Sequence, residues 1–338
     1  MLRGEKTIDV IAMGDLILNF AYAGESSEGI ALYERQPAGA TANMLTQVAR
    51  LGGRAALISV LGNDEHSRYL FDYEKQCGVD MTNVRLGDLP TRIMFVYYDE
   101  NNDRYFSDFQ MERNDAYIEV DEIDYEMVKS SRYLSVKCMP LSPTQPAAEA
   151  MEKILRVARE SDIAIAVDAQ WRGQSMTSEE RAEVRYKAAI SEVVKLTDVE
   201  MEFYYGETDL LKGTERILNA GVTKLVALTL GAFGCLLRTR RAWVYEPGFR
   251  VATLDTTGAG DSFLGALLYS LCRTEHPTDS LAEAELAQIA AFCNACAAYS
   301  TQFRGSLANM ASVADAEKIR ALMPRGERCS YFSQEKRQ

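Results

Sequence analysis

Six short apolar segments rich in β-branched residues alternate along the chain with segments of helical periodicity. The apolar segments are Ile8–Met13, Ala55–Leu61, Tyr133–Val136, Ile163–Val167, Val193–Leu196 and Lys224–Thr229. The helical segments are Ala42–Leu51, Ala147–Arg159, Glu179–Ala189, Thr208–Asn219, Gly260–Cys272 and Leu281–Thr301. Strands that lack polar alternation are buried on both faces, which is typical of parallel sheets. The alternation therefore predicts an α/β fold with a central, mainly parallel sheet covered by helices.

Two stretches interrupt this alternation. Residues 15–38 are Gly-rich and extended in pattern. Within residues 91–112, the segments Arg92–Tyr98 and Arg104–Phe109 flank an Asp- and Asn-rich turn, which is the pattern of a β-hairpin. Together the two stretches predict either a small sheet that projects from the main domain or an ordinary edge hairpin of the main sheet.

The chain of 338 residues is acidic, with a net charge of −12. Such a charge disfavours binding to nucleic acids and to anionic membranes, whereas ATP needs only a local positive field. No apolar run reaches transmembrane length. The seven cysteines are scattered along the chain, and its first residues do not show the pattern of a signal peptide. Together these two observations predict reduced thiols and a cytoplasmic location. We expect one domain over residues 1–338, with a flexible tail at 325–338.

A turn of small residues, Gly258-Ala259-Gly260, joins an extended segment to the helical segment that follows. The first N–H groups of a helix lack partners within the helix, and the helix dipole adds positive potential there. Because small residues let an anion approach the backbone, the turn predicts a phosphate site. Asp261 stands beside it, where a carboxylate can act as a base that orients a hydroxyl group toward a phosphoryl group. The alternative interpretation is a plain helix cap.

The run from Asp255 to Asp261 resembles the signature D-T-x-G-A-G-D of the ribokinase/PfkB family of carbohydrate kinases. Further matches cover nearly the whole chain and are most similar to fructokinases. The resemblance implies a ribokinase-like three-layer αβα sandwich, with a small β-sheet lid that covers the sugar and often mediates dimers. It also implies phosphoryl transfer from ATP to a sugar, with Mg²⁺ and with Asp261 as the base. A monovalent cation such as K⁺ near Asp255 and Thr257 is implied as well.

Four segments resemble the parts of the family that bind the sugar. The residues that the resemblance assigns to the substrate are Asp15, Asn19, Gly39, Asn43, Arg104 and Arg172. Three positions depart from the family pattern, because Asn19 replaces an acid, Ala38 a glycine and Gln170 an asparagine. A neutral amide at position 19 suits a substrate that presents an acceptor, such as a keto or carboxylate oxygen. The plain alternatives are a turn residue for Asn19, a solvated side chain for Arg104 and an ion pair for Arg172.

Other stretches resemble the parts of the family that bind the nucleotide and magnesium. The segment Lys195–Phe203 is similar to the fructokinase stretch K-x-S-D-E-E-x-x-F, in which the residue matching Glu200 organises the water shell of Mg²⁺. The segment Thr229–Gly234 matches the motif T-x-G-x-x-G, and Asn294 resembles an asparagine that lies under the adenine. The residues assigned to the nucleotide are Thr197, Glu200, Thr229, Gly231, Gly234 and Asn294. A helix-start acid and a β-turn are the plain alternatives.

These observations predict an ATP-dependent phosphotransferase that acts on a sugar hydroxyl. A ketose kinase similar to the fructokinases is favoured, and a kinase for 2-keto-3-deoxygluconate, another sugar or a nucleoside is the alternative. A non-catalytic sugar sensor or scaffold on a kinase fold is a second hypothesis, because the departures at Asn19, Ala38 and Gln170 gather on the sugar side. The expected partners are a small-molecule sugar and, through the lid, a second copy of the chain.

Overall fold

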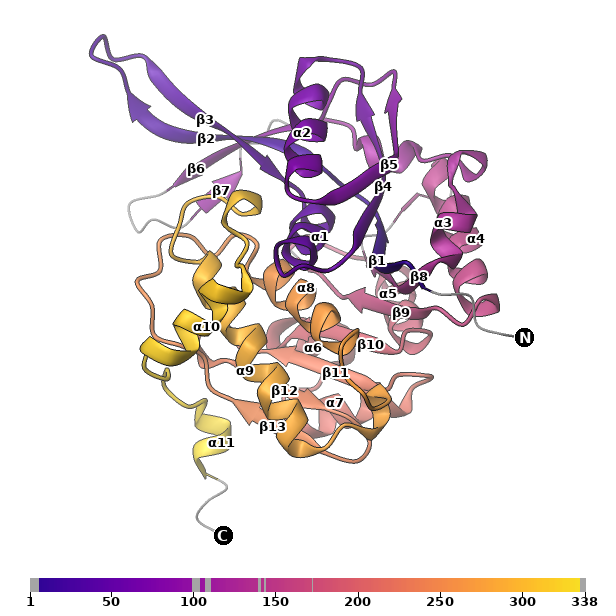
Figure 1. Ribbon diagram of the computed structural model, residues 1–338, viewed down its shortest axis with the longest axis vertical. Coiled ribbons are helices and arrows are strands. Elements are labelled where there is room, and N and C mark those ends of the chain that lie inside the picture. Colours follow the sequence, from indigo (N-terminus) through magenta and orange to yellow (C-terminus); the bar gives the residue numbers. More distant parts are fainter. Residues whose placement is uncertain are drawn as a thin grey trace.

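The computed structural model describes residues 6–98, 104–106, 111–138, 141–142, 144–171 and 173–334. Its main sheet has nine strands in the order β13-β12-β11-β10-β9-β8-β1-β4-β5 (Figure 1). The strands are β1 (Ile8–Met13), β4 (Ala55–Gly62), β5 (Val79–Gly87), β8 (Ser131–Lys137), β9 (Ala164–Asp168), β10 (Val193–Thr197), β11 (Leu225–Thr229), β12 (Cys235–Arg238) and β13 (Trp243–Glu246). Neighbours from β5 to β11 pair in parallel, and β12 and β13 are antiparallel. The predicted central, mainly parallel sheet is therefore confirmed.

Helices cover both faces of this sheet, which confirms the predicted three-layer αβα sandwich (Figure 1). One layer contains α1 (Ala40–Arg50), α2 (Glu65–Gln76), α8 (Ala259–Leu271), α9 (Glu283–Ser300) and α10 (Val313–Leu322), and the other contains α3 (Tyr125–Lys129), α4 (Pro146–Glu160), α5 (Ser178–Ala189), α6 (Asp198–Tyr205) and α7 (Leu210–Asn219). Alternate residues of β1 face the two layers, with Val10 and Ala12 in one core and Ile11 and Met13 in the other. Within the described part of the chain, no helix combines the length and apolarity needed to span a membrane.

A second sheet of four strands lies apart from the main sheet and ends in a projecting arm (Figure 1). Its order is β3-β2-β6-β7, with β2 at Ile17–Glu25, β3 at Ala31–Ala38, β6 at Ile93–Tyr98 and β7 at Arg104–Phe106. Stacked aromatic pairs join its strands, Phe20 with Phe95 and Tyr97 with Tyr105. The two interrupting stretches of sequence thus form a separate sheet and not an edge hairpin of the main sheet.

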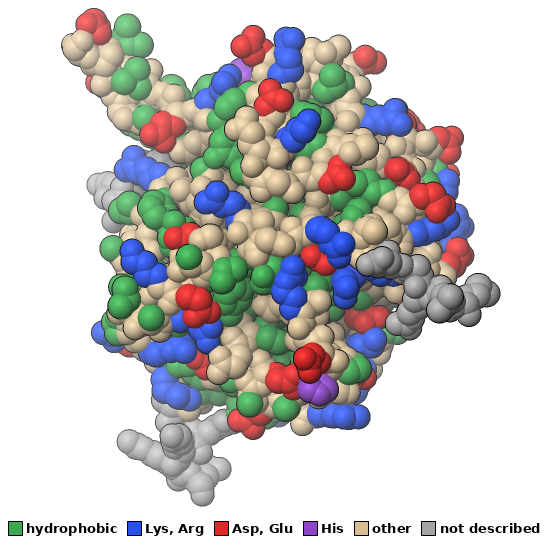
Figure 2. Space-filling model, viewed as in Figure 1, with side chains coloured by type: hydrophobic (Ala, Val, Ile, Leu, Met, Phe, Trp, Pro, Cys, Tyr) green, Lys and Arg blue, Asp and Glu red, His purple; other side chains and the backbone are tan. Residues whose placement is uncertain are grey.

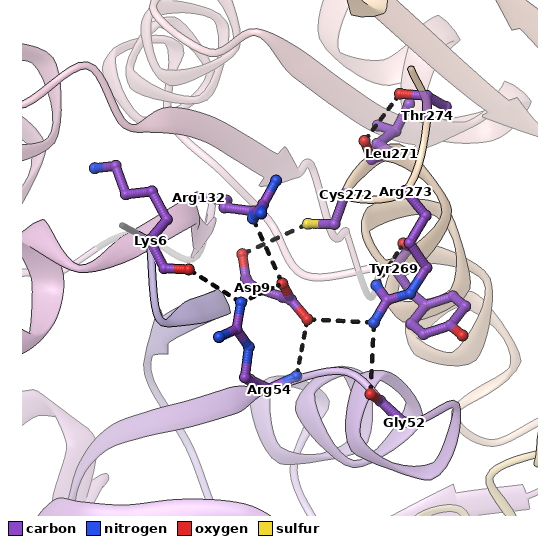
Figure 3. Close-up of polar contacts among 10 residues, drawn as sticks. All are labelled: Lys6, Asp9, Gly52, Arg54, Arg132, Tyr269, Leu271, Cys272, Arg273 and Thr274. Carbon is purple, nitrogen blue, oxygen red and sulfur yellow. Dashed lines mark hydrogen bonds and ion pairs between the residues drawn. The ribbon is translucent and has the colours of Figure 1, made fainter. Parts of the chain in front are cut away.

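Asp9 on β1 forms a charged cluster at the amino-terminal end of the main sheet (Figure 3). Its carboxylate lies within 3.4 Å of guanidinium nitrogens of Arg54 and Arg273 and 3.6 Å from Arg132. Burial opposes ionisation, but the backbone N–H of Arg54 and the guanidinium groups of Arg273 and Arg54 outweigh it and lower the pKa of Asp9. The cluster joins β1, the turn before β4, the start of β8 and the end of α8 at the end of the sheet opposite the candidate site.

The described end of the chain, up to residue 334, contains one further bridge and one further helix. Arg325 pairs with Phe249 in an isolated β-bridge, and helix α11 (Ser330–Gln334) follows. The ring of Phe332 is buried and stacks on Tyr245, with 4.2 Å between the ring centroids. This aromatic contact with β13 holds the segment against the main sheet, at least as far as Phe332.

Glu74 on α2 is fully buried, and its one hydrogen bond comes from the hydroxyl group of Thr46 at 2.6 Å. Burial raises the pKa of Glu74 to about 8, whereas the unfolded chain releases this proton near pH 4.5. The native state therefore binds more protons between these values, so this carboxyl group lowers the free energy of unfolding as the pH rises through that window.

We expect the variant Glu74→Gln to lose that pH dependence, because the amide keeps the shape of the side chain but does not ionise. Relative to the wild type, its free energy of unfolding should rise between pH 5 and 8, by an amount on the order of a few kcal/mol. Denaturant titrations at several pH values measure this, with the exposed Glu152→Gln on α4 as a control. Parallel curves for the wild type and Glu74→Gln would contradict the assignment.

Candidate active site

The sequence-predicted residues gather where the parallel strands end. Asp15 follows β1, Asp168 ends β9, and Thr197 and Thr229 end β10 and β11. The register places Thr197 beside Thr229 on neighbouring strands, so these positions share one edge of the sheet. The carboxyl ends of parallel strands are the usual ligand-binding edge of α/β sheets. The small sheet starts at the same edge, because β2 begins at Ile17, just after Asp15.

The predicted anion turn is held in place by Asp255. One carboxylate oxygen accepts hydrogen bonds from the N–H (2.8 Å) and the hydroxyl group of Thr257, and the other accepts from the N–H of Gly305 at 3.0 Å. Helix α8 then starts at Ala259, with Gly258 as N-cap at a φ of 78°. The N–H of Ala259 donates to the carbonyl of Thr256 at 3.2 Å, so this donor is already used in the turn.

Asp261 lies in the first turn of α8, and neutral amides hold its carboxylate. The Nδ2 of Asn43 on α1 donates to Oδ2 at 2.8 Å, and the Nε2 of Gln170 lies 3.4 Å from Oδ1. The other amide oxygens, Oδ1 of Asn43 and Oε1 of Gln170, are buried without a hydrogen-bond partner. Gln170 also has a φ of 31°, an uncommon backbone conformation for a residue other than glycine and one often found at functional sites. The site thus contains buried acceptors ready for hydroxyl groups beside a fixed carboxylate.

Asp15 is paired with a cation that the sequence analysis did not select. Its Oδ1 accepts from the backbone N–H of Thr41 at 3.1 Å and forms a buried ion pair with Lys137 at the end of β8. A cavity of about 50 Å³ lies beside it and brings together four other residues expected in the site, Asn19, Gly39, Asn43 and Asp261, with Gly258 at its border. The Oδ1 of Asn19 is buried there without a partner. Asn19 therefore faces the candidate substrate site and is not a turn residue.

Glu200 and Thr197 form a capping box at the start of helix α6. Its Oε2 accepts from the N–H of Thr197 at 2.7 Å, its Oε1 accepts from the N–H of Trp171 at 2.8 Å, and the Thr197 hydroxyl accepts from the N–H of Glu200. Burial raises the pKa of Glu200. Among the described residues, no three His, Cys, Asp or Glu side chains are placed to bind a metal ion together. This donor set fits Mg²⁺ that keeps its waters and is bound mainly by phosphates.

The residues expected to bind the nucleotide differ in how closely the rest of the chain packs around them. Gly231 begins a short 3₁₀ turn after β11, and the space where a side chain would stand is open. A Cβ atom at Gly234 would instead meet the carbonyl of Glu246, so this glycine is required for packing. The Nδ2 of Asn294 on α9 donates to the carbonyls of Glu246 and Pro247 at 3.0 and 3.3 Å, and thus supports the loop after β13. These contacts give Gly234 and Asn294 structural roles beside the strands.

A cleft of about 1290 Å³ borders the expected sugar-side residues and the anion turn. It extends from Asp15 and Met94 to the anion turn and Asp261, and Lys195 of β10 also lines it. Arg172 lies outside the described residues. Arg104 pairs with Tyr98 in the small sheet, and the described residues do not include its side chain. The sequence analysis did not select Lys137 or Lys195 as site residues. Lys195 stands between apolar residues of β10, which was the available signal, whereas Lys137 is the last residue of β8.

Gly258 combines a left-handed backbone with a close neighbour, because a Cβ atom there would lie 2.7 Å from the Cβ of Ser306. We expect Gly258→Ala to lower the free energy of unfolding by at least about 2 kcal/mol, from backbone strain and the contact together. Gly52→Ala is the matched control, since Gly52 has a φ of 87° and nothing within 4 Å. It should cost roughly 1 kcal/mol from strain alone. Equal losses in denaturant titrations would show that the contact with Ser306 has no effect.

The chain is similar to known proteins in sequence and in fold. The chain is 30% identical over 312 residues to the Arabidopsis thaliana protein named "Probable fructokinase-3", covering 90% of this chain and 88% of that protein. A Xylella fastidiosa fructokinase with bound ATP superposes with a TM-score of 0.80 at 20% identity, covering 92% of this chain and 98% of that one. A double mutant of Vibrio cholerae O395 fructokinase with fructose, ADP and potassium ion gives 0.78 at 23% identity, covering 94% and 99%. Residues 1–312 match the model of the pfkB family of carbohydrate kinases, so the chain belongs to this family of sugar kinases.

Proposed function

We propose that the protein is a ketose kinase that transfers the γ-phosphoryl group of ATP to a sugar hydroxyl, with Asp261 as the base. The observation that carries this proposal is the position of Asp261. It directly follows the turn Gly258–Gly260, and its Oδ2 accepts a hydrogen bond from the Nδ2 of Asn43 at 2.8 Å. A carboxylate in that place meets both requirements of the reaction, because it lies beside an anion site and faces the cleft.

Each part of the site has a role in this mechanism. Asn43 and Gln170 orient the Asp261 carboxylate toward the sugar hydroxyl, and Asp261 takes the proton as the hydroxyl oxygen attacks. The N–H groups of Gly258 and Gly260 and the positive end of α8 stabilise charge on the phosphoryl oxygens. Glu200 would hold Mg²⁺ through water, and bound Mg²⁺ neutralises phosphate charge.

The nucleotide is assigned to the strand ends beside Glu200. Gly231, which leaves open space above β11, and Thr229 at the end of that strand would contact ATP. The loop after β13, which Asn294 supports and which packs against Gly234, would border the adenine. A potassium ion is proposed near Asp255 and Thr257, because carboxylate and hydroxyl oxygens suit such an ion. The free cysteines suit a reducing compartment, so we place the reaction in the cytoplasm.

The relatives named as fructokinases favour fructose as the substrate. Asn19 offers a buried, unpartnered oxygen and an amide donor, so it can bind a hydroxyl and also an acceptor such as a keto oxygen. 2-Keto-3-deoxygluconate, other sugars and nucleosides are therefore tested beside fructose. A panel of ketoses, aldoses, sugar acids and nucleosides with Mg-ATP, read by coupled ADP release, identifies the substrate class. A sugar-dependent interaction with another protein and no turnover on any compound would favour the sensor or scaffold hypothesis.

In the same assay we expect Asp261→Asn to lower kcat by at least about 100-fold while ATP still binds, because general-base catalysis contributes about 10²–10⁴-fold. Equilibrium titration with Mg-ATP measures the retained binding. Asp72→Asn, an exposed residue on α2, is the control and should keep wild-type turnover. If Asp261→Asn turned over near the wild-type rate, Asp261 would not be the base.

We also propose that the small sheet is a lid over the sugar and mediates a homodimer. Its arm carries exposed apolar side chains, with Ile30 at 64% and Leu32 at 47% exposure, and Figure 2 shows hydrophobic groups at the arm's end. Exposed apolar groups on a projecting strand pair are typical of a protein interface.

We expect the double variant Ile30→Asp/Leu32→Asp to be monomeric in light scattering while the wild type has the mass of a dimer, because buried carboxylates would oppose association. Val222→Asp is a control at another exposed apolar residue and should remain a dimer. A wild type with the mass of one chain would overturn the proposed dimer.

A further inference from the structure

Lys195 is a charged residue in an otherwise apolar strand, and the mechanism above does not use it. Its neighbours on β10, Val194 and Leu196, are fully buried, and Lys195 itself is 4% exposed. Its Nζ lies 3.0 and 3.2 Å from the two carboxylate oxygens of Asp168 on β9, which faces it in the register of the sheet. Burying two charges costs free energy that one ion pair barely repays, so the pair calls for a functional reason.

The ammonium group of Lys195 lies against the anion turn. A Cβ atom at Gly260 would be 2.9 Å from Nζ, so the backbone of the turn passes directly over this nitrogen. Lys195 also lines the large cleft together with Gly258, Gly260 and Asp261. From this place a side chain with four methylene groups can reach an anion at the turn by a small rotation.

The surroundings keep Lys195 charged. Burial alone would lower the pKa of Lys195, but Asp168, Glu200 and, more weakly, Asp261 outweigh it and raise the pKa. Two other cations near the cleft are held by carboxylates, Arg113 by Asp115 at 2.7 Å and Lys137 by Asp15, and Arg92 lines the cleft near Met94. Without a cation, the carboxylates around the turn would repel a phosphoryl group that already carries negative charge.

We propose that Lys195 is a catalytic residue whose ammonium group binds the transferred phosphoryl group in the transition state, with Asp168 holding it ready. This inference rests on the proposed kinase function. In the reaction, the bond between the γ-phosphorus and the bridging oxygen breaks, the bond to the sugar oxygen forms, and ADP leaves. The hydroxyl proton goes to Asp261, and Lys195 neither gains nor loses a proton. The alternative is that Lys195 only neutralises Asp168.

Three variants separate these alternatives: Lys195→Met, Asp168→Asn and the double variant that carries both. If Lys195 binds the phosphoryl group, we expect Lys195→Met to lower kcat by about 10²–10³-fold with a much smaller change in the KM for sugar. The double variant should stay at that low rate, because the ammonium is still missing. Asp168→Asn keeps the ammonium and should turn over at least tenfold faster than both.

If Lys195 only neutralises Asp168, removing both charges together should restore turnover to the level of Asp168→Asn, and this result would overturn the proposal. Asp168→Asn as slow as Lys195→Met would overturn it too. Lys187→Met on α5 is the matched control, since Lys187 is also buried, at 5% exposure, and ion-paired, with Glu183 at 2.6 Å. It should lose stability in thermal unfolding and keep its kcat.

The wild type and Asp261→Asn are measured in the same series. If the wild type is active and depends on Asp261 but Lys195→Met keeps its kcat, the proposed function stands and the role of Lys195 fails. If the wild type turns over no compound of the panel, the proposed function and the role of Lys195 fail together.

Discussion

The candidate site depends on the close crossing of helices α1 and α8. Gln47 on α1 is fully buried, its Oε1 accepts from the Ser262 hydroxyl at 2.7 Å, and both of its amide atoms bond to the backbone of Ala311. A Cβ atom at Gly265 would lie 2.5 Å from the carbonyl of Met44, so a glycine is required at the crossing. Because a satisfied buried amide has one favourable geometry, the crossing fixes the helix starts and thereby the contact between Asn43 and Asp261.

Charge in the cleft follows a consistent arrangement. Asp15 and Asp168 each face a lysine from a neighbouring strand, which is how buried carboxylates are usually tolerated. Asp261 accepts hydrogen bonds from the neutral amides of Asn43 and Gln170, and its charge contributes to the raised pKa of Lys195. The amide donors fix the orientation of this carboxylate without adding a charge.

The sequence predicted the central strands and the long helices because their patterns are strong and local. It did not predict β5, whose residues alternate between buried and exposed, nor β12 and β13, which have four residues each. Motifs likewise singled out Asp261, Asn43 and Asn19, which line one cavity in the structure. The ion pair of Asp168 with Lys195 joins residues 27 positions apart, and the support that Asn294 gives to the loop after β13 depends on packing. Contacts of this kind follow from the arrangement of the strands and are not encoded in any local pattern.

Strand β2 places Asn19 at the candidate substrate cavity and extends, past an irregularity in its pairing with β3 between Tyr22 and Gly24, into the arm that projects into solvent. One end of this strand pair therefore lies at the cavity, and the other end can be held by a neighbour. Any contact that favours one tilt of the arm then also favours one position of Asn19. By thermodynamic reciprocity, a ligand that prefers that position strengthens the contact in return. Binding of a neighbour to the arm and binding of a ligand in the cavity are then coupled by the same free energy.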